Sequence, residues 1–356
     1  MSEGVDLKTR TEAGLRLQSA AIQPFMDDPD CIEIMLNADG SVWIDVLGSG
    51  MRKTDVTIKA PEAKSILNRV ASSLGLTLTV ETPIVEGELV TDGSRIEGLI
   101  PPVVDAPIFA IRKKASKVFT LDDYLAAGII NDEFLNEKFG QEEVAEEAVL
   151  TGTARDILGR LCADRQNILV VGSTSSGKTT FCNALLYEIG QATPEHRVVI
   201  IEDTRELQCP VVNRLELRTL RIAGRDIVTM QHLLKATLRL RPDRIVVGEV
   251  RDRAALDLLK AWNTGHPGGV ATVHANNAKA GLKRIEQLVA EDVGGRVDPE
   301  FIAEAVNVIV FISKTKKRHE NDPGRLVKEI VRVKGWTRER GYVLEPIGGV
   351  KPVFNV

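Results

Sequence analysis

Residues 167–186, NILVVGSTSSGKTTFCNALL, carry the clearest signal of the fold in this chain. They begin with an apolar run, residues 168–171, that is long enough for one buried strand of a parallel sheet. Residues 172–179, GSTSSGKT, then match the phosphate-binding pattern G-x-x-x-x-G-K-[ST] in full. Apolar residues recur at helical spacing from Phe181 onward, so the loop lies between a strand and a helix. The sequence therefore predicts a nucleotide-binding loop, a P-loop.

The residue types of this loop suit the binding of a polyphosphate. Successive backbone N–H groups and the start of the following helix offer hydrogen-bond donors and positive dipole to an anion. Gly172 and Gly177 permit the tight turn. We expect Lys178 to contact the outer phosphates and the Thr179 hydroxyl to ligate Mg²⁺. The predicted nucleotide-binding residues of the loop are Gly172, Ser173, Thr174, Ser175, Ser176, Gly177, Lys178, Thr179 and Thr180.

Composition and charge narrow the class of protein. A chain of 356 residues is expected to form about two domains. The net charge of −4 argues against direct, sequence-specific binding of nucleic acid. The four cysteines are widely spaced and contain no C-x-x-C pair, which predicts buried free thiols in a reducing compartment and no zinc site. With no membrane-spanning run and no signal peptide, a cytoplasmic protein is expected.

Residues 1–118 are predicted to form a small α+β domain. A helix is expected around residues 15–25. Alternating residues predict strands at 32–36 and 42–46, joined by a tight hairpin loop at 37–40. Pro61 begins a helix that ends at Gly75, and further strands are expected at 76–80, 95–100 and 108–111.

Residues 119–150 are predicted to be a linker with a short helix. Thr120 and Asp123 resemble a capping box, so a helix is expected over 120–127. The acidic stretch 131–148 is interpreted as a solvated helix.

Residues 151–356 alternate between strand and helix patterns, which predicts an α/β domain with a parallel sheet. Buried strands are expected at 198–201, 244–249 and 269–274, helices at 230–238 and 255–262, and more strands at 306–312, 329–333 and 342–344. Glu202 and Asp203, Glu249 and His274 lie at the carboxyl ends of the three buried strands. Because the carboxyl ends of parallel strands form the ligand-binding edge, we expect these residues beside the P-loop.

Each of these side chains has a predicted catalytic or structural role. Glu249 is expected to orient or deprotonate the attacking water; the alternative is a solvated carboxylate at a strand end. Glu202 and Asp203 hold the waters of Mg²⁺ or cap the next segment. His274 contacts the γ-phosphate or is structural. Four arginines near the Glu249 strand are candidates for an arginine finger: Arg239, Arg241, Arg251 and Arg253.

Four sequence boxes in fixed order resemble those of the secretion or traffic ATPases, a family of RecA-like motors. A Walker A box lies at 172–180, an Asp box at 200–206, a Walker B box at 240–252 and a His box at 264–276. EIMLNADG at 33–40 and RIEGLIPP at 95–102 are similar to motifs of the conjugal-transfer ATPase of the TrbB type. The P-loop departs from the family pattern at Ser173 and Ser175, where relatives commonly carry glycine.

The resemblance implies a hexameric ATPase that binds ATP and Mg²⁺ and powers conjugal transfer or type IV secretion. Such a motor would be cytoplasmic, peripherally associated with the inner membrane, and partnered by inner-membrane secretion proteins. Nucleotide would lie at the domain junction, where Arg95 and Arg112 of the first domain would either grip its phosphates or remain surface charges. Two alternatives stay open: a type II secretion or pilus retraction ATPase, and, from another class, a RecA-like nucleic-acid helicase.

Overall fold

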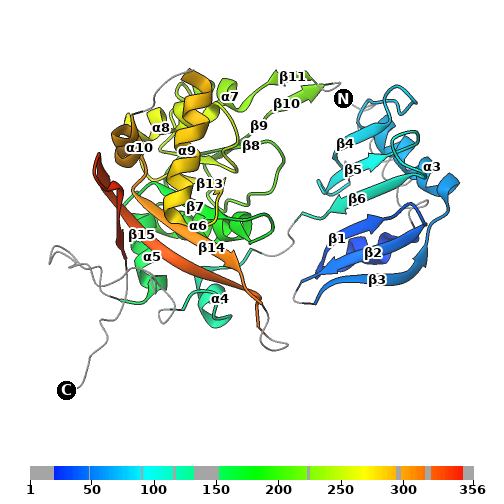
Figure 1. The fold of residues 1–356 in the computed structure, drawn as a ribbon, viewed down its shortest axis with the longest axis horizontal. Helices are drawn as coiled ribbons and strands as arrows, with labels where there is room; N and C mark the ends of the chain where they lie inside the picture. Colours follow the sequence, from blue (N-terminus) through cyan, green and yellow to red (C-terminus); the bar gives the residue numbers. More distant parts are fainter. Residues whose placement is uncertain are drawn as a thin grey trace. The chain divides into compact units, whose positions relative to one another are not determined.

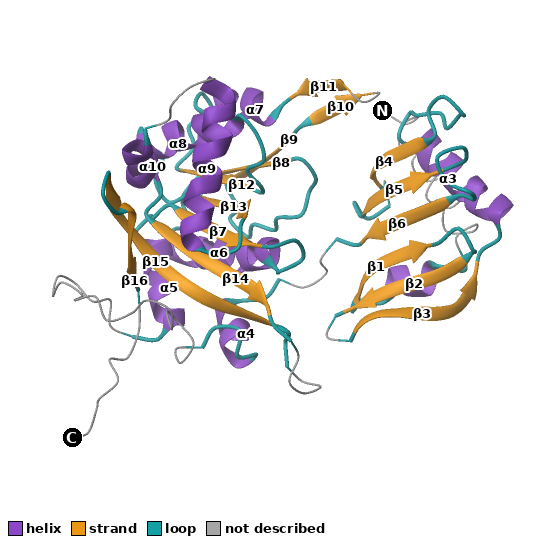
Figure 2. Ribbon diagram, viewed as in Figure 1, coloured by secondary structure: helices purple, strands orange, loops and turns teal. Residues whose placement is uncertain are grey.

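The computed structural model describes residues 20–47, 49–89, 91–114, 118–131, 152–222, 225–293, 298–316 and 322–347. The chain divides into two compact units, Met1–Lys117 and Val118–Val356, and each has its own sheet (Figures 1 and 2). Parts of two predicted helices, residues 15–19 and 132–148, lie outside the described residues.

The first unit is a six-stranded antiparallel sheet in the order β3-β2-β1-β6-β5-β4. The helices α2 (Gln23–Asp27) and α3 (Ala60–Ser73) accompany the strands β1 (Cys31–Leu36), β2 (Ser41–Val46), β3 (Gly50–Thr57), β4 (Ile84–Glu88), β5 (Arg95–Leu99) and β6 (Ile108–Arg112). The predicted hairpin between β1 and β2 is confirmed: Asn37 N donates to Ser41 O over 3.0 Å, and Ser41 N donates to the Asp39 carboxylate over 2.9 Å. Apolar residues of α3 pack in one core with the sheet.

The strand predicted at residues 76–80 is wrong. The chain turns there instead, because the Thr79 and Thr82 hydroxyls lie 2.9 Å apart and Thr79 Oγ1 also accepts the backbone N–H of Thr82. The strand comes later, as β4. Strand β3 was not predicted, since most of its side chains are polar and exposed and show little apolar alternation.

The second unit is built on an eight-stranded sheet in the order β16-β15-β14-β7-β13-β12-β8-β9. Six neighbouring strands of this sheet are parallel, and the inner four correspond to the predicted buried strands: β7 (Ile168–Gly172), β13 (Val270–His274), β12 (Arg244–Val247) and β8 (Val198–Glu202). At the sides of these four lie β9 (Arg214–Arg218), β14 (Val308–Lys314), β15 (Arg325–Thr337) and β16 (Gly341–Pro346). The predicted α/β class with a smaller α+β domain is confirmed.

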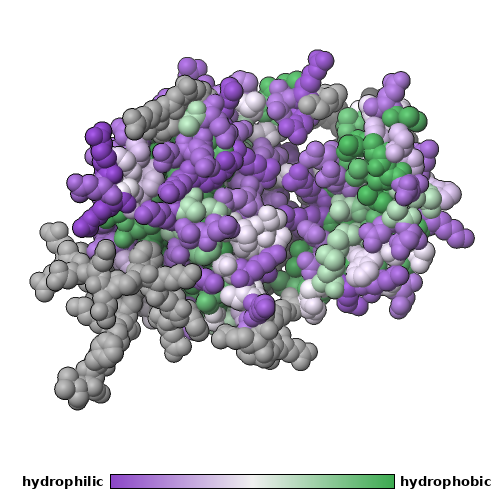
Figure 3. All heavy atoms as spheres, in the orientation of Figure 1, coloured by the Kyte–Doolittle hydropathy of each residue, from purple (hydrophilic) through white to green (hydrophobic). Residues whose placement is uncertain are grey.

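Helices cover both faces of this sheet (Figure 2). Alternate residues of β7 enter two cores: Leu169 and Val171 pack in one, Ile168 and Val170 in the other. The first core includes α7 (Met230–Thr237), α8 (Ala254–Asn263), α9 (Ala278–Val293) and α10 (Pro299–Ala305); the second includes α4 (Leu121–Ala126), α5 (Ala154–Ala163) and α6 (Lys178–Ala192). Burial on both faces explains why the inner strands are continuous apolar runs. The outer surface of the second unit is largely hydrophilic in the view of Figure 3.

Several elements of the second unit were not predicted. The edge strand β9 and the two-stranded ribbon of β10 (Leu220–Ile222) and β11 (Arg225–Val228) consist mainly of exposed or half-buried residues.

All four cysteines are buried and free, as predicted. Among the helices in the described part of the chain, none combines the length and the apolar character needed to cross a bilayer.

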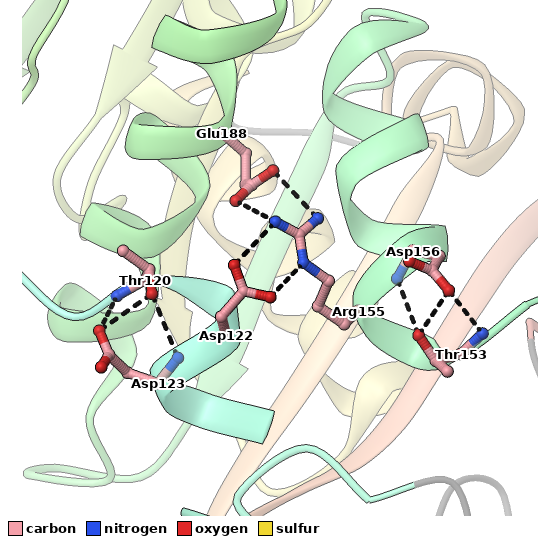
Figure 4. A network of polar contacts seen from close by, with 7 residues as sticks. All are labelled: Thr120, Asp122, Asp123, Thr153, Arg155, Asp156 and Glu188. Carbon is pink, nitrogen blue, oxygen red and sulfur yellow. Dashed lines mark hydrogen bonds and ion pairs between the residues drawn. The ribbon is translucent and has the colours of Figure 1, made fainter. Parts of the chain in front are cut away.

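Helix α4 is part of the core of the second unit, because Leu121 and Tyr124 are buried there. The capping box predicted at its start is confirmed, and Thr153 and Asp156 form a second one at the start of α5 (Figure 4). Arg155 bridges the helices: its Nε lies 2.8 Å from Asp122 Oδ1 on α4 and its Nη2 3.0 Å from Glu188 Oε1 on α6 (Figure 4). One guanidinium therefore fastens α4 and α5 to the P-loop helix.

We expect Arg155→Met to lower the free energy of unfolding by about 2 kcal/mol, because it leaves the largely buried Glu188 carboxylate without its countercharge. Urea denaturation measures this loss. The double variant Arg155→Met/Glu188→Gln should recover part of the stability, since no unpaired charge remains buried. A single variant as stable as the wild type would contradict the bridging role.

Candidate active site

The P-loop connects β7 to α6 at the carboxyl edge of the parallel strands. Helix α6 begins at Lys178, and its N-cap Gly177 has a φ of 99°, which favours glycine. A Cβ on Gly172 would lie 2.4 Å from Ile312 O and 2.4 Å from Ser176 Oγ, so only glycine fits. Ser176 Oγ is buried and has no hydrogen-bond partner within the described part of the chain. A close backbone turn with an unused buried hydroxyl fits a phosphate ligand.

Ser175 adopts a left-handed conformation, with a φ of 56°. This is one of the two positions where the sequence departs from the glycine-rich family pattern, so a serine occupies backbone geometry that glycine adopts more easily. Ser173, Thr174 and Ser175 are exposed, whereas Ser176 and Lys178 are buried. Thr179 and Thr180 are half-buried on the first turn of α6.

Four side chains at the carboxyl edge form a continuous chain of polar contacts. Lys178 Nζ donates to Ser173 O over 3.0 Å and lies 3.3 Å from His274 Nδ1. His274 Nε2 is 3.1 Å from Glu249 Oε1, and Arg251 Nη2 is 2.7 Å from Glu249 Oε2. The fold therefore brings together Lys178, Glu249 and His274, which the sequence places on the P-loop and after two separate strands. Their catalytic roles stay predictions.

The charges along this series of polar contacts favour a neutral His274 between the Lys178 ammonium and the Glu249 carboxylate. Burial and the nearby Lys178 ammonium lower the pKa of His274. A neutral ring can accept a hydrogen bond from Lys178 at Nδ1 and donate from Nε2 to Glu249. Burial alone would raise the pKa of Glu249, but the hydrogen bond and charge of Arg251, with His274 and Lys178, hold it below its usual range. Glu249 is therefore ionised at neutral pH.

Glu202 and Asp203 lie at the end of β8, next to the chain of polar contacts formed by Lys178, His274, Glu249 and Arg251. Glu202 is almost fully buried and its Oε1 accepts the backbone N–H groups of Glu206 and Leu207, over 3.0 and 2.8 Å. Burial nevertheless raises the pKa of Glu202 to about 7. Asp203 Oδ1 accepts a hydrogen bond from Thr219 Oγ1, and Oδ2 lies 3.6 Å from Arg251 Nη1. Glu202 thus caps the next segment, one of its two predicted roles, while Asp203 faces Arg251.

We expect the free energy of unfolding to fall by up to about 3 kcal/mol from Glu202 alone as pH rises from 4.5 to 8. The reason is that the raised pKa makes the folded chain hold this proton more tightly than the unfolded chain, so the stabilisation present at low pH is lost as pH passes through about 7. Glu202→Gln should flatten this part of the pH profile in urea denaturation. An exposed control, Glu304→Gln on α10, should leave the profile unchanged; equal profiles for all three proteins would contradict the expected titration.

The candidate arginines separate into two groups. Arg239 and Arg241 precede β12, at the amino edge of the sheet, opposite the P-loop edge. Arg251 contacts Glu249 and Asp203 at the P-loop edge, and Arg253 is exposed at the N-cap of α8. Within one chain, the candidate that the fold brings to the site is Arg251. Its specific partner was not predicted, although its spacing of two residues from Glu249 was a signal.

Arg95 and Arg112 belong to the first unit. They are direct cross-strand partners on β5 and β6, and each has a carboxylate nearby: Arg95 lies 2.8 Å from Glu86 and Arg112 3.8 Å from Glu33. Two like charges placed directly opposite each other destabilise a sheet. The two glutamates offset part of this repulsion. Binding of phosphate by these arginines stays a prediction.

Three comparisons place the chain among known proteins. The family model described as "Type II/IV secretion system protein" matches residues 136–335. The probable conjugal transfer protein TrbB of Sinorhizobium fredii is 44% identical over 315 residues, which cover 88% of this chain and 87% of that protein. Protein VirB11 of Agrobacterium fabrum is 31% identical over 315 residues, covering 83% and 88%. The crystal structure of the pilus retraction motor PilT with bound ADP has the same fold, with a TM-score of 0.56 at 18% identity, over 95% of this chain and 83% of that one.

Proposed function

The chain belongs to the type II/IV secretion system protein family, and we propose that it is the ATPase that powers a conjugal-transfer, type IV secretion machine. The family resemblance predicted from the four boxes is confirmed. The observation that carries the proposed activity is the contact chain Lys178–His274–Glu249 beside the P-loop. TrbB and VirB11 relatives, which cover more than four fifths of the chain, support conjugal transfer over the type II and helicase alternatives.

The residues of the P-loop would bind the phosphates of ATP. Backbone N–H groups between Gly172 and Thr180 and the N-terminus of α6 provide the donors, and Lys178 balances charge at the outer phosphates. Mg²⁺ fits the oxygen ligands available here: Thr179 on α6 and Asp203, through water, would hold it. When bound, Mg²⁺ would neutralise charge on the phosphate oxygens.

Glu249 would act as the general base in hydrolysis. Its carboxylate accepts a proton from water while the water oxygen forms a bond to the γ-phosphorus and the bond from that phosphorus to the β–γ bridging oxygen breaks. The products are ADP and inorganic phosphate. His274, a neutral neighbour of both Lys178 and Glu249, would contact the γ-phosphate once nucleotide is present.

The assembly would be a homohexamer in the cytoplasm, docked on inner-membrane proteins of the secretion machine. A closed ring would place a neighbouring copy beside the exposed rim of each site. With Mg²⁺ and a non-hydrolysable ATP analogue, light scattering should report a mass near six chains. An active species that remains strictly monomeric under these conditions would contradict the ring.

The first unit would contribute Arg95 and Arg112 to the bound nucleotide. Two adjacent guanidiniums suit a phosphate group, because each binds phosphate oxygens in a bidentate manner and stays charged at any relevant pH. Their direct cross-strand pairing, which costs stability in the absence of an anion, supports this proposal. Such contacts would favour a closed arrangement of the two units when ATP is bound.

We expect the double variant Arg95→Ala/Arg112→Ala to weaken ATP binding and slow hydrolysis, each by about tenfold, because charge-assisted contacts to phosphate are lost. It should also remove ATP-dependent protection of residues 113–150 from protease. The matched control is Arg52→Ala/Lys53→Ala, two exposed basic residues on β3 of the same sheet. Wild-type KM, kcat and protection in the double variant would show that these arginines are surface charges.

Transfer between cells tests the proposed biological role. Donor cells that lack the chain should regain plasmid transfer with the wild-type gene and fail to regain it with Lys178→Ala. Equal transfer with both genes would show that ATP hydrolysis here does not power conjugation. DNA-stimulated ATPase activity of the purified chain with a salt-dependent Kd for DNA would instead support the helicase alternative.

A further inference from the structure

Both carboxylate oxygens of Glu249 already have a donor. Arg251 Nη2 lies 2.7 Å from Oε2, and His274 Nε2 lies 3.1 Å from Oε1. A carboxylate held in this way is a weak base, because each donor stabilises its ionised form. The lowered pKa of Glu249 agrees with this geometry. In the nucleotide-free site, these two donors therefore weaken Glu249 as a base, although it is the residue that would have to accept a proton from water.

Arg251 is the donor that can leave. Its side chain is 50% exposed, and its second contact, from Nη1 to Asp203 Oδ2, is a loose 3.6 Å. Arg244 provides the contrast in the same box: it is fully buried and donates to His196, Gly268 O and Cys162 O over 2.9 to 3.1 Å. Arg244 is fixed by the surrounding backbone, whereas Arg251 is held mainly by one carboxylate at the edge of the site.

We propose that Arg251 exchanges partners during the cycle: it pairs with Glu249 in the nucleotide-free chain and moves to the terminal phosphate of a bound nucleoside triphosphate. This inference rests on the proposed function, in which Glu249 is the general base. A terminal phosphate carries more charge than a carboxylate and accepts a guanidinium in a bidentate manner, so it competes well for Arg251. The exchange frees Glu249 for the water. A diphosphate lacks the γ-phosphate that draws Arg251 away, so the base stays restrained after phosphate release.

The alternative is that Arg251 stays on Glu249 throughout and only positions it. The two models differ in whether triphosphate binding costs the free energy of the ion pair between Arg251 and Glu249. If Arg251 leaves Glu249 when a triphosphate binds, binding must break the ion pair, and replacing Glu249 by a neutral residue removes that cost. If Arg251 stays, nothing is broken, and the effects of substituting Glu249 and Arg251 on triphosphate affinity simply add.

A double-mutant cycle on affinity decides between these models without relying on turnover. The Kd of a non-hydrolysable ATP analogue and that of ADP, both with Mg²⁺, are measured by calorimetry for the wild type, Glu249→Gln, Arg251→Met and the double variant. We expect Glu249→Gln to tighten analogue binding about tenfold more in the presence of Arg251 than in its absence. The cycle with ADP should show no such coupling. Additive effects for the analogue would overturn the exchange.

Two controls keep the outcome interpretable. Arg253→Met removes an exposed arginine two residues away and should show no coupling with Glu249→Gln. Unchanged ADP affinity in Arg251→Met shows that the site remains folded; if that variant loses ADP binding, the cycle is measured with Arg251→Lys, whose single-point charge should give coupling of the same sign but smaller size. Additive effects in that cycle as well would overturn the exchange.

Failure of the exchange can be told apart from failure of the proposed function. If Glu249→Gln hydrolyses ATP at the wild-type rate, Glu249 is not the base, whatever the binding cycle shows. If Glu249→Gln is inactive and the binding effects are additive, Glu249 remains the base and only the exchange by Arg251 is wrong.

Discussion

Lys178→Ala should reduce kcat for ATP hydrolysis by about a thousandfold. The ammonium group lies at the start of α6, within 3.3 Å of His274 and next to the P-loop backbone, where charge develops on the outer phosphate oxygens. Alanine removes that charge and also removes the hydrogen-bond partner of His274. Phosphate release under saturating ATP measures the loss, and circular dichroism melting reports whether the fold is kept.

The control for this variant is Lys260→Ala, an exposed lysine in the last turn of α8. It should retain the wild-type kcat. Wild-type turnover by Lys178→Ala would show that ATP is hydrolysed at some other place in the chain, and the assignment of the P-loop site would have to be abandoned.

Glu249→Gln should retain ATP binding but slow turnover at least about a hundredfold, as expected when a general base is lost. The amide has nearly the same shape as the carboxylate, and its one oxygen can still accept a hydrogen bond from one of the two donors, Arg251 or His274. Steady-state phosphate release gives kcat, and calorimetry with the analogue gives Kd. Glu304→Gln, which changes an exposed carboxylate of α10, should alter neither value.

Equal losses of binding and turnover in Glu249→Gln would mean something different. They would indicate that Glu249 holds the metal ion or stabilises the fold, and the base would have to be sought elsewhere. Glu202 is a poor substitute, because its Oε1 is occupied by the backbone N–H groups of Glu206 and Leu207.

The inner strands and the site at their carboxyl ends could be predicted from the sequence because the physics there is local. Strands buried on both faces must be apolar throughout, so residues 168–171 and 198–201 stand out without knowledge of their neighbours. Parallel strands then bring their carboxyl ends together, which is enough to place Glu249 and His274 near the P-loop. The positions of glycine and lysine within the loop then predict that it binds phosphate.

Other features depend on contacts that no local pattern reveals. Edge elements such as β3, β9 and the β10–β11 ribbon are polar and exposed, so hydrogen bonding to neighbouring strands, not apolar alternation, makes them strands. The opposite error occurred at residues 76–80, where apolar alternation is present but threonine hydroxyls turn the chain. The pairing of Arg251 with Glu249 likewise depends on the fold, which leaves Arg239 and Arg241 before β12 at the opposite edge of the sheet and Arg253 exposed at the N-cap of α8.

A single-turnover experiment with ATP labelled at the γ-phosphate tests the central claim most directly, because it follows binding and bond cleavage at the same site. Wild-type chain, Lys178→Ala and Glu249→Gln are each mixed with labelled ATP and Mg²⁺, and bound label and free phosphate are measured over time. We expect the wild type to release labelled phosphate, Glu249→Gln to retain about one uncleaved ATP per chain, and Lys178→Ala to do neither. Release of labelled phosphate by Glu249→Gln at the wild-type rate would contradict the account.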